Sequence, residues 1–275
     1  MDVTPEVQTE AVAVVKHKRN PVKEFLGAVF LPFLSFAALI IGWELAVRVL
    51  RVPEYILPMP SVFFARVYES RALLWDNMLV TGGEVLMGFG LATVISIPLG
   101  LVIVLTPSLE RAFYPIIVFF QLIPKIAIAP LLIVWFGFGV FPKIFLTFLL
   151  CFFPTLVNSM AGFKAIDPRI LYITRSMGAS SWQTFRYVRV PSALPYIFAG
   201  LAVSIVFAVT GAIVGEFVGA NAGLGYLLLR GSSYLDTALM FAVLVILSIM
   251  GLVLSYSITF LQNMIMPWIR FRKEE

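Results

Sequence analysis

Long apolar runs, separated by short polar stretches, dominate the pattern of this chain. A helix needs about 20 predominantly apolar residues to cross the hydrocarbon core of a bilayer, and runs of roughly that length recur six times. The pattern therefore predicts an all-α, polytopic membrane protein with about six transmembrane helices. The predicted spans are Phe25–Trp43, Val85–Leu109, Ala112–Pro142, Ile144–Phe163, Val190–Gly215 and Thr237–Ile269.

Composition supports a bilayer environment. The chain has 275 residues, of which 60% are hydrophobic and 13% are charged, whereas soluble domains contain roughly 25% charged residues. Its single cysteine, Cys151, and its single histidine, His17, exclude a disulfide framework and argue against a metal site built from these residue types. No Asp lies within a predicted span. We therefore predict no catalytic residues, no metal and no cofactor on this chain.

The Lys and Arg residues cluster between the spans, which explains the net charge of +5 better than nucleic-acid binding does. With both termini in the cytoplasm, thirteen of the twenty basic side chains lie on the cytoplasmic side, six lie outside and Lys125 lies within a span. Cytoplasmic loops carry an excess of Lys and Arg, so this orientation is favoured. It makes residues 1–24 a cytoplasmic tail and residues 25–272 a transmembrane domain.

Residues 52–76 are too polar to span the bilayer, and prolines break their first half. Ser61 is a suitable cap for a short amphipathic helix running to about Trp75. Such a helix would lie on the outer interface of the membrane. An ordinary extracellular loop fits this segment equally well.

Residues 165–190 form a basic, polar island between two apolar runs. Asp167 supplies a capping oxygen, and Pro168 suits the first helical position, so a short helix is predicted to begin there. Gly178 then permits a left-handed turn. A polar hairpin between membrane spans needs a partner or a surface to rest on, which indicates a docking element on the cytoplasmic side.

A second helix is predicted after the glycine turn. Ser180 and Gln183 match a capping box, in which each side chain bonds the backbone N–H of the other residue. Pro191 is expected to end this helix before the next span begins. The predicted order is therefore helix, glycine turn, helix.

The spacing Gly178, nine residues, Val188-Arg189-Val190-Pro191 resembles the cytoplasmic loop of binding-protein-dependent ABC importer permeases. In that family the loop reads roughly Glu-Ala-Ala-x-x-x-Gly, nine residues, Ile-x-Leu-Pro, and here Tyr172, Ile173 and Thr174 take the Glu-Ala-Ala places. The resemblance implies the type I ABC importer permease fold, with a coupling helix that sits in a groove on a separate ATPase subunit. The residues that it assigns to this coupling are Asp167, Pro168, Arg169, Thr174, Arg175, Gly178, Ala179, Ser180 and Pro191.

Motifs elsewhere resemble the nitrate/sulfonate/taurine branch of that family. Ile56-Leu57-Pro58-Met59-Pro60-Ser61 is similar to its Leu-Pro-x-Pro entry, and Ile123–Leu131 is similar to its third span. Thr81-Gly82-Gly83-Glu84, Pro124-Lys125 and Gly215–Ala220 look closest to permeases for thiamine-pyrimidine precursors or riboflavin.

Five polar residues inside or beside the predicted spans are candidates for the substrate path. A charge at the bilayer centre costs roughly 2.5–3.5 kcal/mol on insertion scales, so it faces a cavity, a partner or the interface. Three roles are possible for Lys125: contact with the substrate path, a structural ion pair, or a surface lysine whose ammonium group snorkels to the interface. Glu216 fits a path contact or a pair with a basic neighbour, and Glu84 fits a place near the outer interface. Hydrogen bonds between helices explain Gln121 and Asn158 equally well.

The resemblance implies the permease subunit of an ATP-driven importer, not an enzyme. ATP and Mg are expected on partner ATPase subunits, because no G-x-x-x-x-G-K-[ST] loop occurs in the chain. The other implied partners are a periplasmic or lipid-anchored substrate-binding protein, a second permease copy as a homodimer, and membrane lipid, without nucleic acid. The expected location is the cytoplasmic (inner) membrane of a bacterium or archaeon.

The expected substrate is a small organic nutrient, such as a pyrimidine vitamin precursor or riboflavin. A permease of the same type for nitrate, sulfonate or taurine is an alternative. A self-sufficient secondary transporter would need coupling-ion sites, usually several carboxylates or broken helices in repeated halves. The sequence shows neither a clear internal repeat nor a carboxylate chain.

Overall fold

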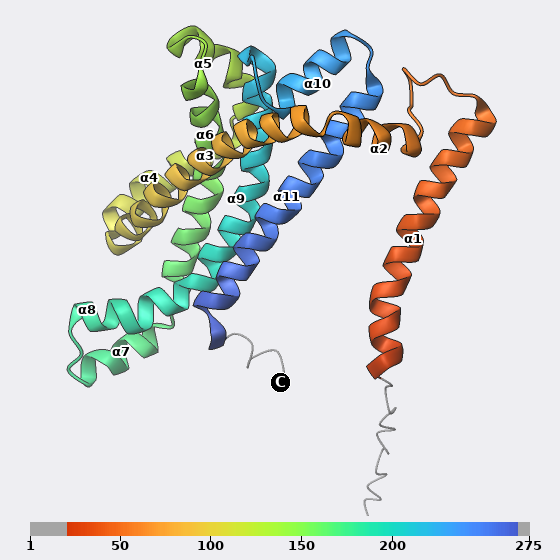
Figure 1. Ribbon diagram of the computed structural model, residues 1–275. Helices are drawn as coiled ribbons and strands as arrows, with labels where there is room; N and C mark the ends of the chain where they lie inside the picture. Colours follow the sequence, from red (N-terminus) through yellow and green to blue (C-terminus); the bar gives the residue numbers. More distant parts are fainter. Residues whose placement is uncertain (1–20, 269–275) are drawn as a thin grey trace, which may run out of the picture. The chain divides into compact units, whose positions relative to one another are not determined.

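The computed structural model describes residues 21–268, with side chains from Phe30 onward. Within these residues every regular element is a helix, which confirms the predicted all-α class (Figure 1). The chain divides into two units, Met1–Val52 and Pro53–Glu275. Most of the predicted cytoplasmic tail, and the last residues of the chain, lie outside the described residues.

The first unit contains one described helix, α1 (Pro21–Leu50). From Phe30 to Leu50 this helix is long and apolar enough to cross a membrane. The predicted first span is therefore helical, and its helix runs on past the predicted end at Trp43. Glu44 and Arg48 form an ion pair of 3.0 Å one turn apart on this extension, the spacing at which helix side chains meet.

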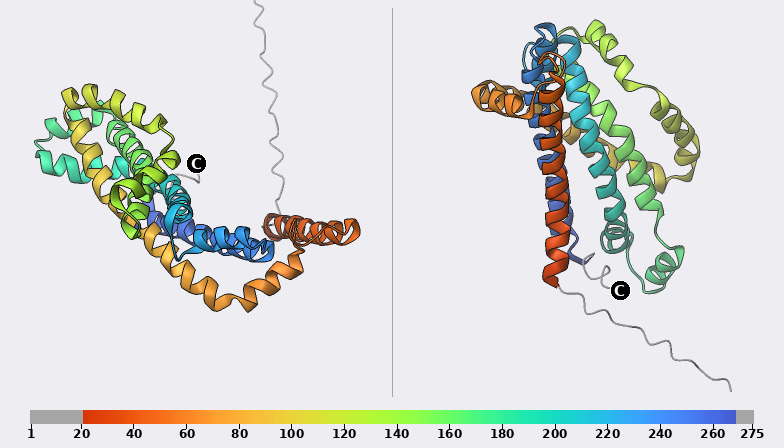
Figure 2. Two further views of the ribbon diagram at one scale, coloured as in Figure 1. Left: turned by 90° about the horizontal axis from the view of Figure 1, so that it is seen from above. Right: turned by 90° about the vertical axis from the view of Figure 1, so that its right-hand side faces the viewer.

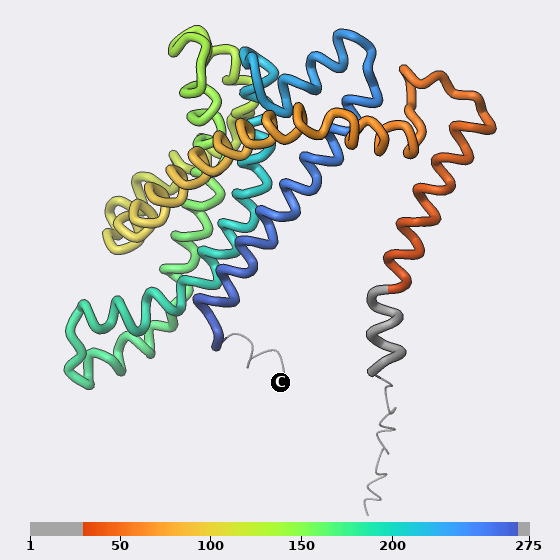
Figure 3. The backbone as a smooth tube through the Cα atoms, in the orientation of Figure 1, coloured from red at the N-terminus to blue at the C-terminus, as the bar shows by residue number. Residues whose placement is uncertain are grey.

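The second unit is a helical bundle whose chain path can be followed in Figure 3. A hairpin lies at one end of the bundle, and two short helices lie at the other end (Figure 1). The elements are α2 (Pro60–Glu69), α3 (Arg71–Leu105), α4 (Pro107–Leu122), the 3₁₀ turn η1 (Lys125–Ile128), α5 (Ala129–Phe136), α6 (Val140–Lys164), α7 (Pro168–Ser176), α8 (Ser181–Thr184), the π turn η2 (Phe185–Arg189), α9 (Val190–Gly219), α10 (Leu224–Ser233) and α11 (Thr237–Ile265).

Five helical segments of the described chain are each long and apolar enough to span a membrane. A bent pair, α4 with η1–α5, brings the number to six if the pair counts as one span. The predicted third span, Ala112–Pro142, corresponds to this bent pair, whose two parts meet at 77° (Figure 2). The break lies between Leu122 and Lys125, where the prolines of this segment favour a broken helix. Pro124 has no N–H to continue the helical hydrogen bonds and disfavours a helical residue before it, so α4 ends at Leu122.

The helix predicted within residues 52–76 is present with different ends. α2 begins at Pro60 after Met59 and ends at Glu69, so Ser61 lies inside the first turn and is not the cap. Proline fixes a helical φ and lacks the N–H that a cap would bond, which suits it to this first position. Trp75 belongs to the following helix, α3, which begins at Arg71 and is longer than the predicted second span.

The main core of the second unit forms among α3, α6, α9, α10 and α11, and α6 packs closely against both α3 and α9. Gly88 on α3 and Gly211 on α9 both face Thr147 on α6. A Cβ added at Gly88 would lie 2.5 Å from the Thr147 side chain, and one added at Gly211 would lie 2.8 Å from the Thr147 Cα. A Cβ at Gly215 would lie 3.0 Å from the Cα of Lys143. Small residues let helix backbones approach closely in a membrane, and Figure 2 shows α6 and α9 side by side.

We expect Gly211→Ala to destabilise the permease, although alanine favours a helix over glycine by about 1 kcal/mol. The added methyl group would press on the Thr147 backbone, and such overpacking typically costs about 1–3 kcal/mol. Gly251→Ala in α11 is the matched control, because nothing lies within 4 Å of a methyl group there. Thermal unfolding in detergent should show a lower midpoint for Gly211→Ala only. Equal midpoints would contradict the close packing of α6 and α9.

Candidate functional site

The first half of the hairpin has the structure that its sequence predicts. The Asp167 carboxylate accepts a hydrogen bond of 2.8 Å from the Arg169 N–H, and Pro168 occupies the first turn of α7. The helix ends at Ser176, and Gly178 follows with a φ of +74°. A side chain is strained at that angle, so glycine is the residue that the turn requires.

The second half confirms the capping box and corrects the role of Pro191. The Ser180 N–H donates to the Gln183 side chain over 2.8 Å, and the Gln183 N–H donates to the Ser180 hydroxyl over 3.2 Å. Pro191 does not end the helix, because α8, the π turn and α9 form one helical path over residues 181–219. The Val190 N–H bonds the Phe185 carbonyl, five residues back. Proline lacks an N–H and crowds the preceding turn, and the π turn takes up that misfit within the helix.

The hairpin surface is unusually apolar for an exposed segment. Tyr172, Met177 and Trp182 are 75%, 79% and 64% exposed. Arg169 and Arg175 are exposed on the same short helix, α7. Apolar patches rimmed by polar residues mark surfaces where another protein binds. The arrangement is suited to docking and offers no chemistry of its own.

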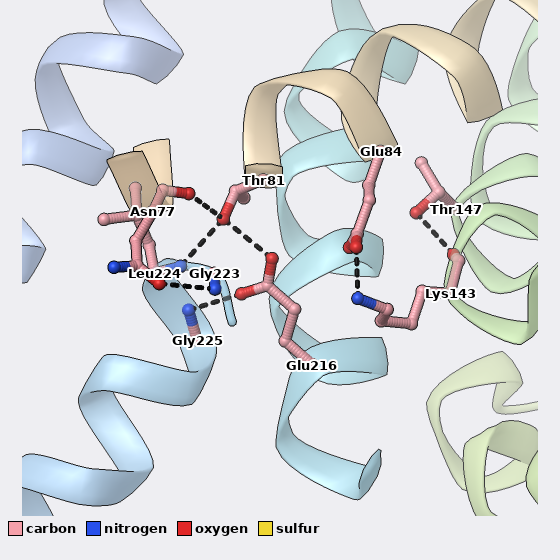
Figure 4. Close-up of polar contacts among 9 residues, drawn as sticks. All are labelled: Asn77, Thr81, Glu84, Lys143, Thr147, Glu216, Gly223, Leu224 and Gly225. Carbon is pink, nitrogen blue, oxygen red and sulfur yellow. Dashed lines mark hydrogen bonds and ion pairs between the residues drawn. The ribbon is translucent and has the colours of Figure 1, made fainter. Parts of the chain in front are cut away.

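A buried polar cluster lies at the opposite end of the bundle, where α3 and α9 meet the start of α10 (Figure 4). The N-cap residue of α10 is a glycine and has no side chain to bond the first N–H groups of the helix. Side chains from the two neighbouring helices do so instead. The bonds run from Gly223 N–H to Asn77 Oδ1 (2.7 Å), from Leu224 N–H to Thr81 Oγ1 (2.8 Å) and from Gly225 N–H to Glu216 Oε2 (2.5 Å).

Glu216 and Thr81 join these bonds into one network. The Thr81 hydroxyl donates to Glu216 Oε1 over 2.7 Å, and the Glu216 carboxylate therefore accepts from a hydroxyl and a backbone amide. Gly223 has a φ of +115°, and a Cβ there would lie 2.1 Å from Glu216. Both facts make glycine necessary at this position. No basic side chain of the described residues lies within 4 Å of Glu216, so Glu216 forms no direct ion pair among them.

Glu84 belongs to the same end of the bundle and forms an ion pair with Lys143 across α3 and α6 (Figure 4). The two side chains are 3% and 8% exposed, so a place at the interface does not explain Glu84. Removing one partner of a buried ion pair typically costs about 3–5 kcal/mol, because the other charge is left uncompensated. The pair therefore fixes α3 against α6.

The remaining predicted path residues lie elsewhere. The Lys125 ammonium donates to the Gln121 carbonyl over 3.0 Å and lies 4.8 Å from the ring centroid of Phe153. The Asn158 side chain bonds the Pro154 carbonyl of its own helix over 2.8 Å. The structure thus brings Glu84 and Glu216 to one cluster, and Gln121 and Lys125 to another place. Their roles in a substrate path stay predictions.

Sequence reasoning did not identify three residues of the buried cluster. Asn77 and Thr81 lie on the same face of α3 as Glu84, at the i, i+4, i+7 spacing that one helix face produces. That spacing is visible in the sequence, but it indicates a shared helix face only once the helix is known to begin at Arg71. Lys143 has no comparable local signal, because its partner lies on another helix.

Comparison with known proteins identifies the family. The family described as binding-protein-dependent transport system inner membrane component matches residues 86–271, more than half of the chain. The chain belongs to this family. This binding-protein-dependent permease is a multi-pass membrane protein and the permease subunit of an ABC importer, not an enzyme.

Relatives with named transport roles are similar to this permease over most of their length. The formylaminopyrimidine transport permease protein of Halalkalibacterium halodurans is 37% identical, over 86% of this chain and 95% of its own. The riboflavin transport system permease protein of Chloroflexus aurantiacus is 35% identical, over 86% and 88%. The taurine transport system permease protein of Escherichia coli is 26% identical, over 85% and 88%. These names confirm the resemblance that the sequence motifs predict.

A solved structure supports the fold. A permease chain of the MetNI methionine ABC transporter, in an inward-facing conformation, superimposes with a TM-score of 0.61. The match covers 71% of this permease and 97% of that chain at 22% identity. It confirms the predicted type I ABC importer permease fold.

We expect Thr81→Val to loosen the start of α10. Valine keeps the shape of threonine but leaves the Leu224 N–H without its acceptor and Glu216 Oε1 without its donor. An unsatisfied buried group costs about 1–3 kcal/mol. Thr93→Val is the matched control, because the Thr93 hydroxyl bonds only a carbonyl of its own helix. Hydrogen exchange at the Leu224 and Gly225 amides should become faster in Thr81→Val and not in Thr93→Val. Unchanged exchange in both variants would contradict the capping role.

Proposed function

We propose that residues 165–190 form a cytoplasmic coupling hairpin that docks on a separate ATPase subunit. The exposed apolar and basic surface of the hairpin supports this role. The coupling residues are those that the family motif indicates, from Asp167 and Pro168 at the start of α7 to Pro191 in α9. The chain itself holds no cofactor, and ATP and Mg bind to the partner.

The observation that carries the proposal is the unbroken helical path from the hairpin into the bundle. Residues 181–219 pass from α8 through the π turn into α9 without a loop. On its other side, the hairpin is joined to α6 by only residues 165–167. A movement of the hairpin therefore reaches α6 and α9 together, and these two helices are packed closely along each other. The ATPase would in this way bias a two-state membrane element.

The proposed complex lies in the cytoplasmic membrane of a bacterium or archaeon. The hairpin and both termini face the cytoplasm, in keeping with the excess of basic residues on that side. A second copy of the permease completes the path. The family description supports a binding protein as a partner. In the proposal this protein is periplasmic or lipid-anchored and delivers the cargo at the end where α10 lies.

The cargo that we propose is a pyrimidine vitamin precursor, with riboflavin as the nearest alternative. The relatives named for formylaminopyrimidine and riboflavin are 37% and 35% identical to this permease, whereas the taurine permease is 26% identical. A cargo of the sulfonate and taurine type is therefore the weaker reading.

Reconstitution tests this function. Proteoliposomes holding the permease and its ATPase, with the binding protein supplied, should take up formylaminopyrimidine only when ATP is hydrolysed. Riboflavin and taurine are assayed in parallel. Uptake of taurine alone would show that the cargo is of the sulfonate and taurine type. Uptake by the permease without ATPase subunits would indicate a secondary transporter and overturn the proposal.

We expect Gly178→Val to uncouple transport from ATP hydrolysis. A β-branched residue is strongly disfavoured at positive φ, so the turn between α7 and α8 would change shape while the membrane bundle stays intact. Gly178→Asn is the control, because asparagine tolerates the left-handed conformation. Uptake should fall severely in Gly178→Val and remain in Gly178→Asn, with equal amounts of folded complex. Full uptake in Gly178→Val would show that the turn geometry is not needed.

A further inference from the structure

The bend between α4 and α5 borders a cavity of about 280 Å³. The cavity reaches from the bend to α6 and α9. Its wall is mostly apolar and carries two polar side chains, the composition that small-molecule sites usually have. The lining includes Gln121, Lys125, Ile126, Leu150, Pro154 and Phe207.

Lys125 is the charged group of this cavity, and it is not neutralised as the other two lysines with described side chains are. Lys143 and Lys164 each form an ion pair with a glutamate. Within the described residues no carboxylate lies within 4 Å of Lys125, which instead bonds a backbone carbonyl and lies over the Phe153 ring. An ammonium has three N–H donors, so a donor remains for a further acceptor.

The rest of the lining is mostly apolar. Leu150 and Pro154 of α6 and Phe207 of α9 line the cavity. The wall therefore combines a cationic donor with the aromatic side chain of Phe207.

We propose that this cavity binds the transported cargo, and that the cargo is a small planar ring. One edge of the ring carries a carbonyl or ring-nitrogen acceptor for Lys125. This proposal rests on the proposed function, because it places the cavity in the transport path. The cavity's volume of about 280 Å³ lies just below the usual range of about 300–1,000 Å³ for small-molecule sites, which fits a small cargo.

A cysteine introduced at Ile126 reports on occupancy of the cavity. Ile126 lines the cavity and is 50% exposed, so a small thiol reagent can reach it, whereas the native Cys151 is fully buried. Formylaminopyrimidine added to the Ile126→Cys permease–ATPase complex should slow labelling, and toluene, a ring without acceptors, should not. Leu73→Cys lines a different cavity and is the control at which neither compound should protect.

Lys125 variants then test the assigned contact. Lys125→Met in the Ile126→Cys background should raise the formylaminopyrimidine concentration needed for protection about tenfold to hundredfold, the effect of losing a hydrogen bond to a charged group. Lys125→Arg keeps the charge and should retain protection. Equal protection in Lys125→Met, or no protection with Lys125 present, would overturn the proposal. Should Lys125→Met fail to fold, the comparison of formylaminopyrimidine with toluene still decides it.

The labelling experiment separates this inference from the proposed function. Protection is measured without ATP, whereas the proposed function is judged by ATP-driven uptake. Uptake of formylaminopyrimidine without protection at position 126 would support the proposed function and contradict the assigned cavity. Protection without ATP-driven uptake would contradict the proposed function and support the binding site.

Discussion

The close passage of α6 between α3 and α9 sets the geometry of the second unit. In lipid, no hydrophobic force drives one apolar helix against another, so packing and internal hydrogen bonds must hold the bundle together. Glycines at positions 88 and 211 let both neighbours approach the same residue, Thr147. This approach places Lys143 opposite Glu84. The ion pair is therefore a consequence of the helix packing and also reinforces it.

The same helices connect the two ends of the bundle. α9 carries Glu216 near its last turn, where the carboxylate holds the start of α10, and at its other end it continues into the hairpin. α6 carries Lys143 near one end and Lys164 at the other, and Lys164 pairs with Glu110 at the start of α4. Both helices that flank the hairpin are thus fixed to their neighbours by charged groups. In the proposed function, a displacement of the hairpin would therefore act on both of these helices.

Local signals in the sequence predicted the hairpin well, and signals that depend on distant residues were missed. Asp167, Gly178 and Ser180 act on backbone groups within a few residues, so each could be read from its neighbours. Pro191 was misjudged because proline can end a helix or be accommodated by a π turn, and the choice depends on the packing of α9. The Glu84–Lys143 pair joins residues far apart in the chain, and no local pattern marks it.

The polar groups inside the bundle fall into two kinds, and the difference bears on function. Glu216 and Lys143 have their charges met by partners within the chain, and such satisfied groups give stability and a fixed arrangement. Lys125 is met only in part, by a carbonyl and an aromatic ring, beside a cavity and a break in the helix. A charge in the membrane is costly unless something compensates it. Where the chain leaves that compensation incomplete beside a cavity, a cargo molecule with an acceptor group would complete it, and this is why the proposed cargo site is centred on Lys125.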